Sequence, residues 1–443
     1  MSNERAVARS LAAVWHPCTQ MKAHERFPLV PVARAKGAWL EDFEGKRILD
    51  GVSSWWVNLL GHGHPEIEAA IRDQLGKVSH VMLAGFTHEP VIELSERLAR
   101  AAPGKLGHAF YASDGASATE IALKMAFHYW ANRGQRGKNR FVSLDGGYHG
   151  ETVGALAVTD VAIFRDAYAP LLRENLRVPF PGEPGAIEAL EKLLAERSAE
   201  IAALIVEPIV QGAAGMRMYS PEYLAQARAL CTRYNVLLIA DEIMTGFGRT
   251  GTLFAWEQAG GSGLDLMCLS KGITGGFLPL SCVLCTDEVY AAFYDDDVAR
   301  GFLHSHSYTG NALACRAACT VLDILERDGV IAANQVKAKR FTASAIELAM
   351  HPAVRNFRQR GMIWAFDVRE EFAGENFAER FTLAGREREL LIRPIGRTVY
   401  LMPPYAFDSA LAQWLARQVG ATLDRVLESV PHHAARTAEP PTA

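Results

Sequence analysis

Apolar runs and amphipathic segments alternate along the middle of this chain, and this alternation restricts the fold more than any other feature. Runs with strand character occupy residues 109–112, 140–144, 202–206, 236–240, 265–269 and 280–285. Segments with helical character lie among them at 116–130, 187–197 and 222–234. Such alternation is typical of βαβ crossovers, which build a mostly parallel sheet with helices on both faces. We therefore predict an α/β fold with one large domain of this kind.

The two ends of the chain have a different pattern. Residues 29–50 predict an antiparallel hairpin, with turns at Lys36-Gly37 and Glu44-Gly45. From about residue 330 onward, a helical segment at 336–349 is followed by short strands at 363–368 and 398–401. We predict that both ends form one small α+β domain, from residues 1–60 and 331–430, beside a large domain of residues 61–330. The tail, residues 431–443, is expected to be disordered.

Composition and charge exclude several classes of function. The chain has 443 residues, 49% of them hydrophobic and 22% charged, which is ordinary for a globular protein. Its formal net charge of -4 disfavours nucleic-acid binding. No apolar run approaches the ~18 residues of a membrane span, and no leader is visible, so we expect a cytoplasmic protein. The pairs Cys282/Cys285 and Cys315/Cys319 are expected to be buried core thiols.

Two ionisable residues stand at the ends of apolar runs. Lys271 follows the run 265–269 and Asp241 closes the run 236–240. Ligands of parallel sheets bind at the carboxyl ends of strands, and a buried lysine loses its proton easily and attacks aldehydes. Pyridoxal phosphate needs an imine to its aldehyde and an anion at its ring nitrogen. The pair therefore favours this cofactor, although a helix-capping Asp241 is the simpler alternative.

Two glycine-containing segments predict further contacts to such a cofactor. Ser113-Asp-Gly-Ala-Ser117 joins a strand to a helix, where free backbone N–H groups bind phosphate. Gly115, Ala116 and Ser117 are the expected phosphate ligands, and a simple capped helix start is the alternative. Tyr148 follows Gly146-Gly147 and is expected to lie flat on the cofactor ring, unless it is a core tyrosine.

Candidate substrate residues are fewer and less specific. Adjacent Trp55 and Trp56, if they lie in a strand, point to opposite sides, so one is expected to line a cavity for a long apolar substrate. Ordinary packing explains them equally well. Arg393 follows an apolar run and is suited to a substrate carboxylate, or is a surface arginine. The histidines have no third ligand at zinc spacing, so we predict no metal site.

These segments together resemble the class III pyridoxal-phosphate aminotransferases of fold type I, over about residues 14–425. The Asp-Glu and Ser-Lys segments mark the whole class, and the Trp-Trp and Leu-Met-Pro-Pro-Tyr segments mark its branch in biotin biosynthesis. The matching motifs are Trp15-His-Pro-Cys-Thr-Gln-Met21, Ser53-Ser-Trp-Trp-Val-Asn58, Ala84-Gly-Phe-Thr-His88, Gly146-Gly-Tyr-His-Gly150, His304-Ser-His-Ser-Tyr-Thr-Gly-Asn311, Arg393-Pro394 and Tyr400-Leu-Met-Pro-Pro-Tyr405.

The resemblance implies a role for each candidate residue. Lys271 would hold the cofactor as an imine, Asp241 would pair with the ring nitrogen, and Tyr148 would cover the ring. Gly115 and Ala116 would bind the phosphate, which Ser307 would reach from the partner subunit of a homodimer. The implied substrate pocket consists of Trp55, Trp56, Tyr148, Ser305 and Arg393.

The resemblance also implies a reaction, the transamination of 8-amino-7-oxononanoate to 7,8-diaminononanoate with S-adenosylmethionine as amino donor. Five positions depart from the family pattern: Cys18 replaces a tyrosine beside the donor site, Ala116 a serine, Glu151 an aspartate, and Ser305-His306 a Gly-Pro pair. Lysine as donor, or an ω-amino acid substrate, is therefore the alternative. A nicotinamide enzyme is disfavoured, because no G-x-G-x-x-G follows a first strand.

Overall fold

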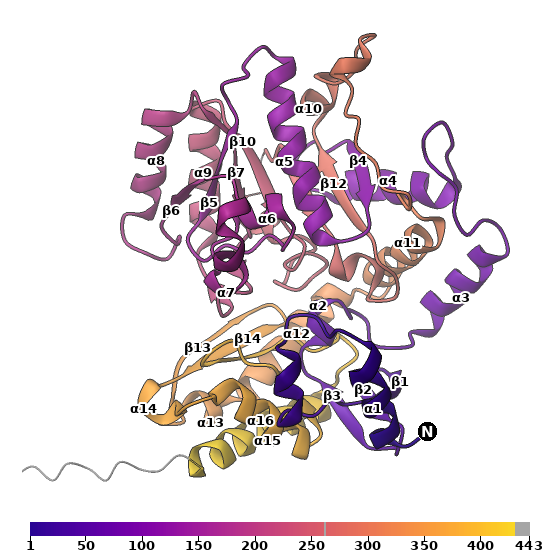
Figure 1. The fold of residues 1–443 in the computed structure, drawn as a ribbon, viewed down its shortest axis with the longest axis vertical. Helices are drawn as coiled ribbons and strands as arrows, with labels where there is room; N and C mark the ends of the chain where they lie inside the picture. Colours follow the sequence, from indigo (N-terminus) through magenta and orange to yellow (C-terminus); the bar gives the residue numbers. More distant parts are fainter. Residues whose placement is uncertain (261–262, 430–443) are drawn as a thin grey trace, which may run out of the picture.

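The structure is a computed structural model that describes residues 1–260 and 263–429 (Figure 1). The tail predicted at 431–443 lies outside these residues. The α/β prediction is confirmed: a seven-stranded sheet has the order β4-β12-β11-β10-β7-β5-β6, and only β12 runs antiparallel to its neighbours. Its strands are β4 (His108–Ala112), β5 (Arg140–Leu144), β6 (Leu176–Val178), β7 (Ile201–Val206), β10 (Leu237–Asp241), β11 (Leu266–Leu269) and β12 (Ser281–Cys285).

Helices cover both faces of this sheet, and its central strands are consequently apolar throughout. Every residue of β7 and β10 is buried, as expected for parallel strands with two covered faces. The helices around the sheet are α3 (Pro65–Leu75), α4 (Glu89–Ala101), α5 (Gly115–Asn132), α6 (Val153–Val158), α7 (Ala162–Arg165), α8 (Ala186–Arg197), α9 (Pro221–Arg233), α10 (Asp287–Ala291) and α11 (Ala312–Arg327).

The predicted core cysteines are confirmed. Cys282 and Cys285 are buried on opposite faces of β12, each in a different hydrophobic cluster. Cys315 and Cys319 are buried on α11. None of the described helices combines the length and the apolar character needed to cross a bilayer.

Both ends of the chain meet in the smaller half of the molecule (Figure 1). The N-terminal strands β1 (Val32–Lys36), β2 (Trp39–Asp42) and β3 (Arg47–Asp50) form a sheet that ends with β15 (Leu390–Leu391), which pairs with β3 in parallel. A second sheet has the order β13-β14-β16, with strands β13 (Val354–Arg360), β14 (Ile363–Val368) and β16 (Thr398–Leu401). These pairings support the division that we propose, with residues 1–60 and 331–430 in the small domain and 61–330 in the large one.

The helices of the chain ends pack on these two sheets. The helix expected at 336–349 is two helices, because Ala345 caps α12 and α13 begins after it. The set comprises α1 (Asn3–Ala13), α2 (Ser53–Trp56), α12 (Val330–Ser344), α13 (Ile346–Ala349), α14 (Glu370–Ala373), α15 (Phe377–Glu387) and α16 (Ser409–Glu428). A two-stranded hairpin of β8 (Val210–Gln211) and β9 (Arg217–Met218) extends from the large sheet.

Candidate active site

Lys271 lies at the carboxyl end of β11, in the first position of a short 3-10 helix, Lys271–Thr274. Its backbone has a φ of +46°, a left-handed conformation that side chains rarely adopt without a tertiary reason. Burial lowers the pKa of its amine, while the carboxylates of Asp241 and Glu207 oppose that shift. Its Nζ stands 4.7 Å from the centre of the Trp56 ring and makes no hydrogen bond or ion pair with the described residues. A partly desolvated, unpaired amine of this kind is suited to attack a carbonyl group.

Asp241 lies on the neighbouring strand, because β10 and β11 run parallel and Asp241 stands opposite Cys268. Its side chain is only 4% exposed. One carboxylate oxygen accepts a hydrogen bond from the Ile243 N–H at 3.1 Å. The other is 2.7 Å from His149 Nδ1, which therefore carries the proton, since a carboxylate only accepts.

His149 is a site residue that the sequence reasoning missed. It is fully buried, and its main chain is held at both ends: Thr159 Oγ1 accepts from its N–H at 3.0 Å, and Thr119 Oγ1 donates to its carbonyl at 2.8 Å. The matching motif Gly146-Gly-Tyr-His-Gly150 contains this histidine directly after Tyr148, and this position could have indicated a site residue. A buried histidine that donates to a buried carboxylate keeps that carboxylate oriented.

The start of α5 supplies unpaired backbone donors. Asp114 caps this helix and accepts hydrogen bonds from the N–H of Ser117 at 2.9 Å and from its hydroxyl at 2.7 Å. Both donors of Ser117 are therefore engaged, whereas the N–H groups of Gly115 and Ala116 have no partner among the described residues. A side chain at position 115 would meet Ile243 at 3.0 Å. The geometry thus favours Gly115 and Ala116 over Ser117 as phosphate ligands.

Tyr148 lies above this helix start, between two carboxylates. Its N–H donates to Glu207 Oε2 and its hydroxyl donates to Glu151 Oε1, both at 2.9 Å. Burial, together with the nearby Glu151 carboxylate, holds the pKa of the Tyr148 hydroxyl far above its usual value. The hydroxyl is therefore a donor and not a base at neutral pH.

Glu207 is the second site residue that the sequence reasoning missed. In the sequence it is visible only as the residue after the apolar run 202–206. It is buried and lines the site. Its two oxygens accept hydrogen bonds from the N–H groups of Tyr148 at 2.9 Å and Gly212 at 3.0 Å. Burial raises its pKa to about 7. Glu207 thus holds both the Tyr148 loop and the β8–β9 hairpin in place.

A cavity of about 330 Å³ brings these residues together. The predicted Lys271, Asp241, Tyr148, Gly115, Ala116 and Trp56 line it, with His149, Glu151 and Glu207. A cavity of this size, apolar with a few convergent polar groups, is typical of small-molecule sites.

Trp55 and Trp56 do not lie in a strand. They belong to α2, a single turn in which residues 53–56 all have positive φ. Asp50 stabilises the turn by accepting from the N–H of Ser54 at 2.8 Å and from its hydroxyl at 2.7 Å. The two tryptophans differ in their surroundings: Trp56 is 6% exposed, lines the cavity and faces Lys271, whereas Trp55 is 43% exposed.

Arg393 lies outside the cavity, next to Trp55. Its guanidinium sits 4.8 Å from the centre of the Trp55 ring and donates to the Cys18 carbonyl at 3.3 Å. Ser305 and Ser307 do not reach the cavity of their own chain; both are exposed on the loop before α11. The structure therefore brings Lys271, Asp241, Tyr148, Gly115, Ala116 and Trp56 together in one cavity. The predicted Ser117, Trp55, Arg393, Ser305 and Ser307 do not line it.

Comparisons with known proteins agree with this geometry. Residues 20–423 match the family model "Aminotransferase class-III". The chain is 44% identical to adenosylmethionine-8-amino-7-oxononanoate aminotransferase of Helicobacter pylori, over 91% of this chain and 94% of that protein. It is 40% identical to the enzyme of the same name from Aquifex aeolicus, over 89% and 91%.

Solved structures of two relatives have the same fold. The Methanocaldococcus jannaschii protein named adenosylmethionine-8-amino-7-oxononanoate aminotransferase superimposes with a TM-score of 0.91 at 33% identity, over 96% of this chain and 99% of that one. An (S)-enantioselective ω-transaminase from Thermomicrobium roseum also gives 0.91, at 32% identity and the same coverage. The chain therefore belongs to the class III aminotransferases, and its fold is the fold type I architecture of that family.

Proposed function

We propose that this protein transfers an amino group from S-adenosylmethionine to 8-amino-7-oxononanoate and so forms 7,8-diaminononanoate for biotin biosynthesis. The observation that carries the proposal is the cavity where the Lys271 amine and the Asp241 carboxylate come from adjacent strand ends. The proposed substrates are those in the name shared by relatives of 40% identity and above.

The residues of the cavity fit pyridoxal phosphate. Gly115 and Ala116 offer two unpaired N–H groups to a phosphate at a helix start. Asp241, held by His149, suits a protonated ring nitrogen, and Tyr148 suits one face of the ring. Lys271 suits the aldehyde. When bound, this cofactor supplies an electron sink that stabilises negative charge on the substrate carbon.

Side chains of this protein transfer the protons, exclude water and bind the substrates. Lys271 Nζ takes a proton from the α-carbon of the donor and returns a proton to the acceptor carbon in the second half-reaction. This role requires the neutral amine, and burial, which lowers the pKa of Lys271, favours that form. Trp56, packed against Nζ and hydrogen-bonded through Nε1 to the Tyr400 hydroxyl at 3.1 Å, excludes water from the amine. Arg393, which contacts Trp55 outside the cavity, binds the carboxylates of both substrates in turn.

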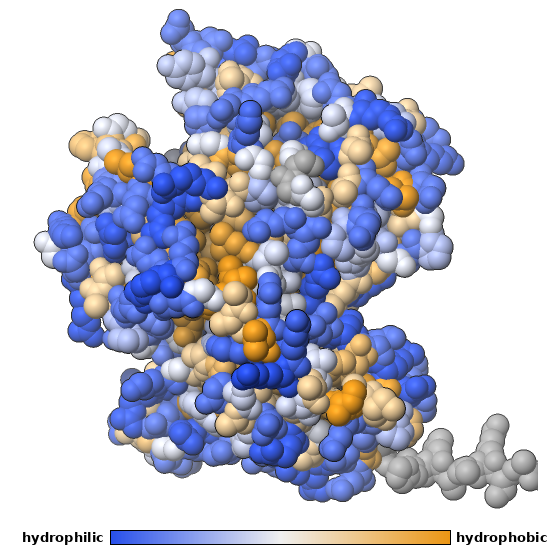
Figure 2. All heavy atoms as spheres, turned by 180° about the vertical axis from the view of Figure 1, so that it is seen from behind, coloured by the Kyte–Doolittle hydropathy of each residue, from blue (hydrophilic) through white to orange (hydrophobic). Residues whose placement is uncertain are grey.

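We propose a homodimer in which the partner subunit's Ser307 completes the phosphate site. The loop that holds Ser307 packs on residues 79–86: the Ser307 carbonyl is 2.7 Å from His80 Nε2, and the rings of Tyr308 and His80 lie 4.9 Å apart at a tilt of 45°. Exposed apolar side chains surround this contact, namely Met82, Phe86, Leu303 and Tyr308. Figure 2 shows apolar residues exposed near the middle of the back face of the molecule. Covering the apolar side chains around the Ser307 loop with a second copy would bury surface that monomers rarely expose.

The competing function is an ω-amino acid transamination, or the same reaction with lysine as donor. The structural similarity to an ω-transaminase keeps it open, and Cys18 beside Arg393 marks where donor recognition would differ. We propose cytoplasmic action on small molecules, with no nucleic acid, membrane or metal partner.

Adding S-adenosylmethionine and then lysine to the cofactor-loaded enzyme separates these functions. Only a true donor should bleach the visible absorbance of the bound cofactor, and only 8-amino-7-oxononanoate should restore it. Bleaching by lysine and not by S-adenosylmethionine would overturn the donor assignment. Failure of 8-amino-7-oxononanoate to restore the absorbance would overturn the acceptor.

A further inference from the structure

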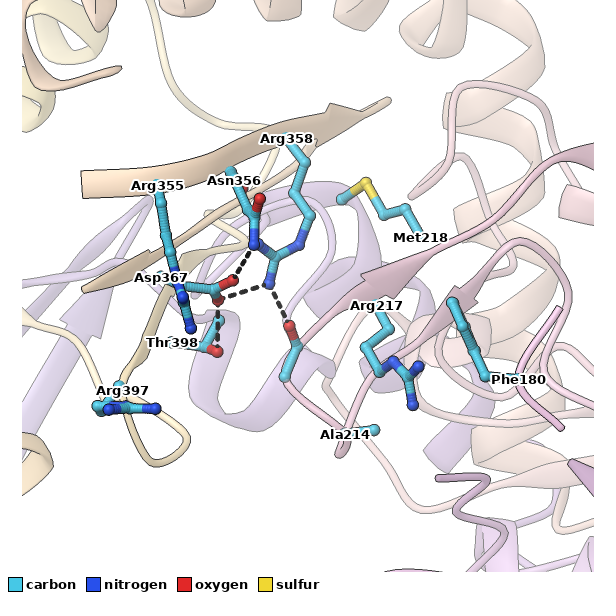
Figure 3. Close-up of a pocket in the computed structure, with 11 residues that line it drawn as sticks. Phe180, Ala214, Arg217, Met218, Arg355, Asn356, Arg358, Asp367, Arg397 and Thr398 are labelled. Atoms are coloured by element: carbon cyan, nitrogen blue, oxygen red, sulfur yellow. Dashed lines mark hydrogen bonds and ion pairs between the residues drawn. The ribbon is translucent and has the colours of Figure 1, made fainter. Parts of the chain in front are cut away.

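A second cavity, of about 490 Å³, lies where the β8–β9 hairpin of the large domain meets the β13-β14-β16 sheet (Figure 3). Four arginines line it. Arg217 comes from β9, on the large-domain side, and Arg355, Arg358 and Arg397 come from the small domain. One acid, Asp367, is among the lining residues. The proposed transamination uses none of these side chains.

A β-bulge in β13 turns two of the arginines toward the same space. Arg355 pairs with Asp367 of β14 and Arg358 pairs with Ala365, so three steps along β13 match two along β14. Residues three apart in a regular strand point to opposite faces. The extra residue, Asn356 at a φ of +51°, restores both arginines to one face. Bulges are typical of positions where a side chain is re-aimed for a function.

The four arginines differ in what they already bind. Arg358 is fully used: it donates to the carbonyls of Met216 at 2.9 Å and Gly215 at 2.6 Å and to Asp367 at 3.1 Å. Asp367 is also satisfied, because Thr398 and Asn356 donate to it. This pair therefore joins the two domains and leaves no net charge. Arg355 has neither a hydrogen bond nor an ion pair within the described part of the chain.

The other two arginines have partners that solvent can replace. Arg217 lies over the Phe180 ring at 3.6 Å, which orients its guanidinium, and contacts Glu183 at 3.2 Å. Arg397 contacts Glu370 at 2.8 Å. The side chains of Glu183 and Glu370 are 53% and 85% exposed, and ion pairs with such exposed partners contribute little. An anion inside the cavity can compete with them.

We propose that this cavity binds a small anion with two or more phosphate or carboxylate groups, which joins Arg217 of the large domain to Arg355 and Arg397 of the small one. Guanidinium groups on opposite walls match such a ligand, because each takes one oxyanion group bidentately. Binding would restrain the β8–β9 hairpin. That hairpin also reaches the active site, where Gly212 donates to Glu207.

Calorimetric titration of the cofactor-loaded enzyme with pyrophosphate, and separately with citrate, tests this proposal. The bound cofactor keeps either probe from the phosphate site at α5. We expect one anion per chain with a dissociation constant below about 1 mM, and the preferred probe distinguishes a phosphorylated ligand from a polycarboxylate. Arg355→Gln and Arg217→Gln should each weaken binding about tenfold, whereas Arg355→Lys should keep part of it.

Arg425→Gln is the matched control, since Arg425 is an exposed arginine of α16 outside the cavity. Its binding constant should equal that of the unmodified enzyme. No heat with either probe up to about 10 mM, or equal weakening in Arg425→Gln, would overturn the proposal. Hydrogen exchange supplies a second measurement: bound pyrophosphate or citrate should slow exchange in residues 212–218. These readouts do not depend on turnover, so the substrate assignment can fail without affecting them.

Discussion

The imidazole of His149 and the carboxylate of Asp241 meet at 2.7 Å inside the protein, where both side chains are almost completely buried. The first comes from a glycine-rich loop after β5 and the second from the end of β10. The contact therefore ties the loop that presents Tyr148 to the strand that presents the anion. The orientation of Tyr148 and that of Asp241, the two proposed contacts to the cofactor ring, therefore depend on each other.

Replacement of His149 by Phe should lower kcat/KM by about 10- to 100-fold, because hydrogen bonds to charged groups contribute about 1.5–3 kcal/mol. Among the described residues, Asp241 would keep only the Ile243 N–H as a donor. His128→Phe is the control, because His128 lies on α5 outside the cavity. Unchanged kinetics in His149→Phe would contradict the role given to this residue.

Replacement of Lys271 by Ala should abolish turnover, by at least the 10²- to 10⁴-fold typical of a lost acid–base group. The cofactor should remain bound through its phosphate, and borohydride should no longer attach it to the chain. Lys138→Met is a matched control. Lys138 is also buried, with a pKa lowered to about 8 by burial, but it donates to three backbone carbonyls away from the site. That variant should melt at a lower temperature and keep its turnover per bound cofactor.

Glu207 should make the protein less stable as the pH rises. Its pKa is raised from 4.5 to about 7 in the folded state, so between these values the folded protein holds a proton that the unfolded chain has lost. The free energy of unfolding should therefore fall across this window, by on the order of 3 kcal/mol for a shift of this size.

Glu207→Gln should remove that contribution, and denaturant unfolding at pH 5 and pH 8 measures it. Glu222→Gln, at an exposed position early in α9, should keep the slope of the unmodified protein. Parallel pH profiles for Glu207→Gln and the unmodified protein would refute the shift.

Replacement of Arg393 by Ala should raise the KM of both carboxylate substrates by about 10- to 100-fold, with a smaller effect on kcat, because it removes a charge-assisted contact. Arg425→Ala should leave both KM values unchanged. A larger effect on kcat than on KM would place Arg393 in the chemical step and not in binding.

Replacement of Ser307 by Ala should weaken cofactor binding by about 2- to 10-fold, the effect of one lost hydrogen bond. Ser307 does not line the cavity of its own chain. Weaker cofactor binding would therefore mean that Ser307 reaches the cavity of the partner subunit. Ser305→Ala, two positions away, should instead change substrate KM and leave cofactor affinity as it was. Equal cofactor affinity in Ser307→Ala and the unmodified enzyme would contradict the shared site.

The sequence by itself determined the α/β class of the fold and the strand ends that carry Lys271 and Asp241. Period and composition act locally, so the strands at 140–144, 363–368 and 398–401 have the expected bounds. The positions of Lys271 and Asp241 could be predicted for the same reason. Each stands at the end of a buried strand, and the carboxyl ends of parallel strands meet at one edge of the sheet.

The tertiary structure decided the contacts between distant segments. The contacts of His149 with Asp241 and of Glu207 with Tyr148 join residues far apart in the chain. The left-handed turn at residues 53–56 also has a distant partner, because Ser53 Oγ donates to the Met402 carbonyl. The bulge that turns Arg355 beside Arg358 depends on the pairing of β13 with β14. The free energy of these contacts comes from burial and from hydrogen bonds between distant residues. Neither produces a periodic pattern in the sequence.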